Sequence, residues 1–146
     1  MKSVTAVGLG VLIALAIGLL VVFGIIAPVL TRFFGLELVG STAIPIILMV
    51  FADAFSFYFG GMAASYRAPA RRRLHGTLVA PVAFAISPAI NLASGEGMFP
   101  GLNTRGAVLL VAVFLAVSFA AAYVGARRGA ALYAYNQKLP PYHHRR

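Results

Sequence analysis

The chain has 146 residues, of which 61% are hydrophobic and only 10% charged, and its formal net charge is +9. Soluble domains carry about 25% charged residues, so this composition excludes an ordinary water-soluble domain and indicates one membrane domain, residues 1–146. The sequence contains no cysteine, which excludes disulfide exchange, thiolate catalysis and cysteine-ligated metals.

Four long apolar stretches predict four transmembrane helices, because about 20 apolar residues cross a bilayer. We expect the helices at residues 4–30, 42–66, 77–93 and 106–126. The first is longer than the apolar core of a cleavable signal peptide, so it should be retained as a helix. The fourth can continue as a helix past Arg127 and Arg128 into a basic tail, residues 127–146. The predicted fold class is all-α, an integral membrane four-helix bundle.

Positive charge is concentrated at the two ends of the chain and in the loop between the second and third stretches. Ten of the twelve lysine and arginine residues lie there, namely Lys2, Arg67, Arg71, Arg72, Arg73, Arg127, Arg128, Lys138, Arg145 and Arg146. The other two loops contain one each, Arg32 and Arg105. Because loops rich in lysine and arginine stay in the cytoplasm, this pattern predicts an inner (plasma) membrane protein with both termini cytoplasmic. It also favours contact with anionic lipids over binding to nucleic acid.

Asp53 is the most unusual residue of the apolar stretches. It lies about 16 Å along the second one, near the middle of a hydrocarbon layer about 30 Å thick. A charged aspartate there costs about 3 kcal/mol, so we expect its carboxyl group to be protonated or hydrogen-bonded inside the bundle. Ser56 lies one turn further on, and Ser87 and Asn91 of the third stretch are the expected polar partners. Three roles stay open: a structural hydrogen bond, a contact with a partner subunit, and a proton or cation site.

Small residues spaced four apart occur in three of the stretches and allow helices to approach closely. They are Gly10, Ala14 and Gly18 in the first, Gly61 and Ser65 in the second, and Ala121, Gly125 and Gly129 in the fourth. We expect this spacing to serve packing within one bundle, with oligomerisation as the alternative.

The basic residues beside the second and fourth stretches form a candidate patch for anionic lipid or phosphate. Its members are Arg71, Arg72, Arg73, His75, Arg127 and Arg128. The alternative is that these charges only determine topology. The chain has three acidic and three histidine residues in all, and they are too scattered for paired-carboxylate catalysis, a metal cage or haem ligation. We therefore expect no catalytic residues, no metal and no cofactor.

The sequence GGMAA at residues 60–64, followed by RRRLHG at residues 71–76, resembles uncharacterised prokaryotic four-helix integral membrane proteins. In these, a glycine-rich end of the second span precedes a basic loop and a His-Gly pair before the third span. The ending Gly125-Ala126-Arg127 of the fourth stretch also fits. The resemblance implies a fold and no activity.

These observations favour a non-enzymatic multi-pass membrane protein, an accessory or assembly subunit that packs against other membrane proteins or against copies of itself. The first alternative is a small transporter or channel subunit that uses Asp53. The second is a membrane enzyme that handles lipid headgroups at the cytoplasmic arginines, although no nucleophile or base accompanies them.

Overall fold

The computed structural model describes residues 2–33, 43–94 and 104–138. All regular secondary structure in these ranges is helical, and no strand occurs in them. The all-α prediction is therefore confirmed.

The first apolar stretch forms one helical rod in three parts: α1 (Lys2–Val21), the π-helical turn η1 (Val22–Ile26) and α2 (Ala27–Phe33). In η1 the amide of Ala27 donates to the carbonyl of Val22, five residues back. Pro28 explains the wide turn, because it has no N–H to donate to the carbonyl of Gly24 and its ring displaces that carbonyl. This turn was not among the elements predicted from the sequence.

The second apolar stretch forms α4 (Ile44–Arg67), with Pro45 in its first turn, where a missing N–H costs little. The fourth forms α7 (Thr104–Lys138), a single helix of 35 residues. It runs far past Arg127, as the sequence allowed, so much of the expected basic tail is helical.

The segment after α4 corrects one prediction, because residues 67–76 are not all loop. Residues Arg72–Thr77 form a short helix, α5, and α6 (Val79–Ser94) follows it. The amides of Leu74 and His75 both donate to the carbonyl of Arg71, which starts the first turn. The amide of Leu78 donates back to Leu74, which continues the backbone hydrogen bonding toward α6.

Three helical segments in the described residues are long and apolar enough to cross a membrane. They are Ser3–Phe33, Ile44–Arg67 and Val108–Lys138. They indicate a membrane protein. Helix α6 is not one of them, because its 16 residues span only about 24 Å. The structure thus supports three of the four predicted spans by length and composition.

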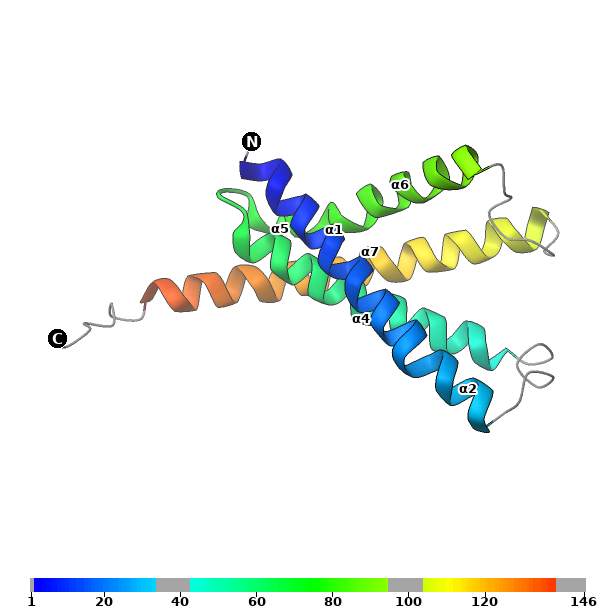
Figure 1. Cartoon of the computed structure of the whole chain (residues 1–146). Coiled ribbons are helices and arrows are strands. Elements are labelled where there is room, and N and C mark those ends of the chain that lie inside the picture. Colours follow the sequence, from blue (N-terminus) through cyan, green and yellow to red (C-terminus); the bar gives the residue numbers. More distant parts are fainter. Residues whose placement is uncertain (1, 34–42, 95–103, 139–146) are drawn as a thin grey trace.

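The helices form two arms that meet near α5 and diverge from it (Figure 1). The first arm consists of α1, η1 and α2 packed along α4, and the second consists of α6 and the N-terminal part of α7, whose C-terminal part crosses α4 and extends past α5 (Figure 1). The start of α1, the end of α4 and all of α5 lie at the end of the molecule where the arms meet (Figure 1). Arg67, Arg71–Arg73, Arg127, Arg128 and Lys138 belong to this end, which we call the basic end.

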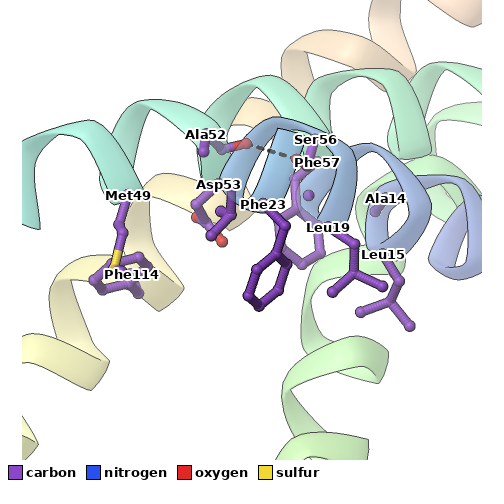
Figure 2. Close-up of a pocket in the computed structure, with 12 residues that line it drawn as sticks. Ala14, Leu15, Leu19, Phe23, Met49, Ala52, Asp53, Ser56, Phe57 and Phe114 are labelled. Carbon is purple, nitrogen blue, oxygen red and sulfur yellow. Dashed lines mark hydrogen bonds between the residues drawn. The ribbon is translucent and has the colours of Figure 1, made fainter. Parts of the chain in front are cut away.

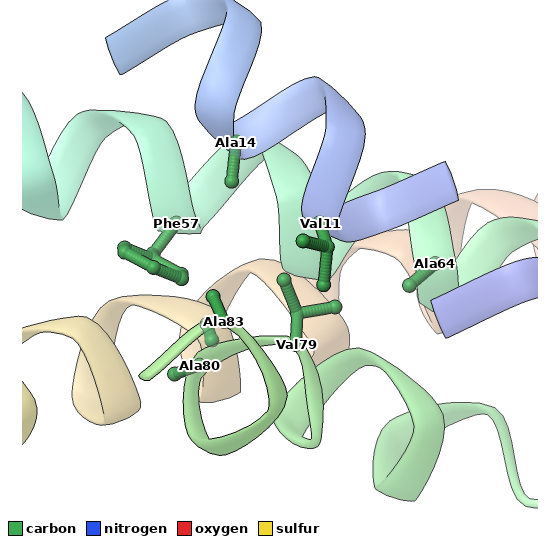
Figure 3. Close-up of a cluster of buried hydrophobic side chains, with 8 residues drawn as sticks. Val11, Ala14, Phe57, Ala64, Val79, Ala80 and Ala83 are labelled. Carbon is green, nitrogen blue, oxygen red and sulfur yellow. The ribbon is translucent and has the colours of Figure 1, made fainter. Parts of the chain in front are cut away.

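Two apolar clusters hold these helices together. The larger joins the arms where they meet and contains Val11, Ala14, Phe57, Ala64, Val79, Ala80, Ala83 and Ala122 (Figure 3). The smaller lies within the first arm and contains Ile26, Leu30 and Ala52. The core is therefore concentrated near the basic end, and the second arm is separate from the first at its far end.

Glycines bring α1 and α4 into backbone contact. A Cβ atom added at Gly10 would lie 2.7 Å from the carbonyl oxygen of Gly60 and 2.7 Å from the Cβ of Ala64. A Cβ at Gly60 would in turn lie 2.8 Å from the Cβ of Ala14. Real Cβ atoms do not approach this closely, so the crossing requires glycine at both positions.

Helices α4, α5 and α7 meet in the same way. A Cβ at Gly61 would overlap the backbone of Ala122, and one at Gly76 of α5 would overlap the carbonyl of Gly61. Ser65 adds a polar contact, since its Oγ donates to the carbonyl oxygen of Ala126 at 2.8 Å. This hydrogen bond ties α4 to α7.

The glycines of α7 lie directly on the backbone of α4. A Cβ at Gly125 would overlap the carbonyl of Tyr58, and one at Gly129 would overlap the carbonyl of Met62. Ala121 packs beside the larger apolar cluster. The structure thus places the small residues that the sequence singled out at contacts between helices of this one chain. We call the contacts made by Gly10, Gly60, Gly61, Gly125 and Gly129 the glycine contact.

Candidate functional site

An open groove lies beside Asp53, with a volume of about 330 Å³ (Figure 2). Its lining comes from α1, η1, α4 and one residue of α7: Ala14, Leu15, Gly18, Leu19, Val22, Phe23, Met49, Ala52, Asp53, Ser56, Phe57 and Phe114. Figure 2 shows Asp53 between the Met49–Phe114 pair and the α1 side chain Leu19. Apart from Asp53 and Ser56, every side chain in the lining is apolar.

The carboxyl group of Asp53 is bound by Ser118 of α7. Ser118 Oγ lies 2.5 Å from Asp53 Oδ2 and 2.6 Å from the carbonyl oxygen of Phe114. A serine hydroxyl has a single proton to donate. Ser118 is the donor in both contacts, so its one proton is shared between the Asp53 carboxyl oxygen and the carbonyl oxygen of Phe114.

This arrangement joins the two arms by a polar contact inside the membrane segment. Double-mutant cycles on such intramembrane hydrogen bonds give about 0.6 kcal/mol on average and at most about 1.7. Ser118 takes the place of Ser87 and Asn91, the partners of Asp53 that the sequence predicted, although the sequence also contains a signal for Ser118. Ser118 lies four residues before Ala122 and seven before Gly125, on the small-residue face of α7 that packs on α4.

The other predicted polar residues lie elsewhere. Ser56 is buried and donates to the carbonyl oxygen of Ala52 at 2.6 Å, within α4. It faces α1, where a Cβ on Gly18 would lie 3.4 Å from its Oγ. The backbones of Ser87 and Asn91 belong to α6, but their side chains lie outside the described part of the structure.

At the basic end, Arg72 is bound into the fold. Its guanidinium group donates to the carbonyl oxygens of Ser65, at 3.3 Å, and Tyr66, at 2.5 Å. The carbonyls of the last turn of a helix have no partner within the helix, so Arg72 caps α4. Its Cζ also lies 3.2 Å from the ring centroid of Tyr133, which adds a cation–π contact with α7.

The other members of the predicted patch remain at the surface. Arg71 and Arg73 are exposed, as are Arg127 and Arg128 of α7, and the Cζ of Arg127 lies 6.0 Å from the ring centroid of Tyr123. His75 is half-buried, with its Nδ1 3.2 Å from the carbonyl oxygen of Arg71. The structure thus separates one arginine with a structural role from a group of exposed ones.

No group of three His, Cys, Asp or Glu side chains that could hold a metal occurs within the described ranges. Comparison of the chain with models of protein families, with curated proteins and with solved structures finds no match. Arguments about function therefore rest on the groove, on Asp53 and on the basic end.

Proposed function

We propose that this chain is a non-enzymatic multi-pass membrane protein that serves as an accessory or assembly subunit. In this proposal the transmembrane helix of a partner membrane protein packs between the two arms and inserts side chains into the groove beside Asp53. The single observation that carries the proposal is this half-buried carboxyl group in an otherwise apolar groove.

The energetics of the carboxyl group favour an occupied groove. Only Oδ2 of Asp53 has a hydrogen-bond partner among the described side chains, and the groove is open. A polar group that faces lipid tails is costly, whereas one that faces a hydroxyl or amide of a packed helix is satisfied. The groove therefore fits a partner helix with small and polar residues, whose hydroxyl or amide groups can donate to the remaining carboxyl oxygen.

The orientation in the membrane follows from the distribution of charge. Eight described lysine and arginine residues belong to helices or turns at the basic end when Lys2, the first residue of α1, is included, while Arg32 lies in the last turn of α2 and Arg105 in the first turn of α7, away from it. The proposal therefore places the basic end in the cytoplasm, with both termini on that side. In this proposal α6, although short, is the third of four spans in chain order. Together with α5 it reaches from the basic end into the membrane.

Transport through Asp53 is the alternative function. A transporter needs a hydrated or polar path from its ion site to each side of the membrane. The glycine contact lies between Asp53 and the basic end, and helix backbones touch there. The polar side chain at this contact, Ser65, already donates its proton to the carbonyl oxygen of Ala126. This closure favours the accessory-subunit proposal.

Site-specific photocrosslinking tests the proposal. A photoreactive amino acid replaces Leu19, which lines the groove, or Leu20, which is similarly exposed at the same depth and does not line it. We expect the Leu19 position to give one adduct of discrete protein mass in native membranes, and the Leu20 position to give lipid adducts only. Lipid adducts alone at Leu19, or an adduct of twice the mass of the chain, would contradict the proposal.

Substitutions of Asp53 separate the two functions. Asp53→Asn keeps a hydrogen-bonding group, so the protein adduct at Leu19 should persist, whereas Asp53→Leu should abolish it. The amount of folded protein is measured for each variant by gel filtration in mild detergent. Ion or proton flux in liposomes that Asp53→Asn abolishes would instead support transport, because only a transporter requires the carboxyl group to ionise.

A further inference from the structure

No carboxylate of the described residues lies beside the arginines of the basic end. The chain has three acidic residues, and Asp53, the only one in the described ranges, lies within α4 and is bound to Ser118. Within the described ranges, the arginines of the basic end therefore have no acidic side chain as a partner.

Within this end, Arg72 fixes the position of its two neighbours. Its hydrogen bonds to the last turn of α4 and its contact with Tyr133 attach the start of α5 to both α4 and α7. Arg71 and Arg73 flank this anchored residue and are exposed. Their Cα atoms are thus held by a third arginine, which reduces the conformational entropy lost when they bind a ligand.

The backbone of Arg71 is strained. Its φ of 43° and ψ of 44° place it in the left-handed region, and among the described residues it is the only one other than glycine with positive φ. This conformation costs a non-glycine residue about 1 kcal/mol. Glycine would adopt this conformation without that cost. An arginine here therefore lowers the stability of the fold, which points to a role for its side chain. Residues held in such conformations cluster at binding sites.

A shallow depression of about 550 Å³ lies at this point, lined by Ala70, Arg71, Arg72, Arg73, Leu74 and Ala130 of α7. Its lining therefore combines two exposed guanidinium groups with three apolar side chains. Guanidinium groups bind phosphate oxygens in pairs, and apolar side chains suit the glycerol and acyl portion of a lipid. Free phosphate would use only the arginines.

We propose that this depression binds the phosphate group of an anionic glycerophospholipid, with Arg71 and Arg73 as its ligands and Arg72 as the residue that positions them. The site goes beyond the positive-inside rule, because that rule needs only net charge in the loop. A bound lipid needs these two side chains at this depression.

Lipid binding to the purified full-length protein in detergent tests the proposal. Native mass spectrometry gives the Kd for phosphatidylglycerol, with phosphatidylcholine as the zwitterionic reference. The site variant is R71Q/R73Q, and the matched control is R128Q/K138Q, which removes the same charge from exposed positions on α7. We expect the site variant to bind phosphatidylglycerol about 30-fold more weakly and the control less than about threefold more weakly.

Three results would overturn the proposal. Equal losses in both double variants would show that the lipid responds to diffuse charge. Unchanged binding in R71Q/R73Q would exclude these ligands. Displacement of the lipid by inorganic phosphate at equal concentration would show that the site takes phosphate from solution.

Arg71→Gly keeps the proposal testable if the double variant is unstable. Glycine relieves the left-handed strain, so this variant should unfold less readily than the wild type and still bind phosphatidylglycerol more weakly. A purely structural role for Arg71 would instead leave lipid binding unchanged or lower stability and binding together.

Discussion

Replacing Gly10 by alanine probes the glycine contact most directly. The added methyl group would lie 2.7 Å from each of three atoms, on Gly60, Ala64 and Val79. Ordinary contact requires α1 to retreat by about 0.5 Å or more, and a gap of that size forfeits a quarter or more of the dispersion energy across the interface. Overpacking of this kind costs about 1–3 kcal/mol.

Gly8→Ala is the matched control, because a Cβ at Gly8 has no neighbouring atom within 4 Å. Both substitutions lie in α1 and gain the same helix propensity, at most about 1 kcal/mol. The difference between them therefore isolates the steric cost. We expect Gly10→Ala to be less stable than Gly8→Ala by about 1–3 kcal/mol.

Unfolding in mixed micelles with increasing SDS, followed by far-UV circular dichroism, measures this difference. Circular dichroism suits the chain because it has no tryptophan. The reasoning is refuted if Gly10→Ala proves as stable as Gly8→Ala, since α1 would then not lie against α4 at this glycine.

Three further experiments test the site, the anchoring arginine and the orientation. Ser118→Ala removes the hydrogen bond to the intramembrane carboxyl group and should lower the free energy of unfolding by about 0.6–1.7 kcal/mol in the same assay. An unchanged free energy of unfolding would contradict this hydrogen bond. Arg72→Gln should cost about 1–3 kcal/mol, whereas Arg73→Gln should cost less than about 0.5 kcal/mol, and equal effects would show that Arg72 is not the anchor. Because the chain lacks cysteine, a single introduced cysteine reports on which side of the membrane it lies. A membrane-impermeant thiol reagent added to intact cells should label Phe33→Cys and leave Ala70→Cys unlabelled. The reverse pattern would contradict the proposed orientation.

Hydropathy was sufficient to predict the long helices, because membrane helices satisfy their own backbone hydrogen bonds and need only a long apolar run. It could not predict η1, where the carbonyl opposite Pro28 widens a turn without changing composition. It also missed α5, because Arg72–Thr77 is polar and is held by Arg72 against α4 and Tyr133. These are tertiary contacts, which a local pattern does not contain.

The candidate site was also predicted only in part, because its hydrogen bond is a tertiary contact. Asp53 stands out in any reading of the sequence, because an acid in an apolar stretch is costly. Its partner depends on which face of α7 meets α4, and that rotation is set by the small residues near Ala122 and Gly125. Reading Ser118 as part of that face, four and seven residues before them, would have identified the hydrogen bond.

Helices α4 and α7 are in backbone contact at Gly61, Gly125 and Gly129, and their next polar contact toward the far end of the first arm is the hydrogen bond from Ser118 to Asp53. Asp53 is eight residues from Gly61, about 12 Å along α4, so a rotation of about 10° of α7 against α4 at this contact would displace it by about 2 Å. A hydrogen bond does not survive that displacement. The bond from Asp53 to Ser118 therefore opposes any rotation of α7 against α4.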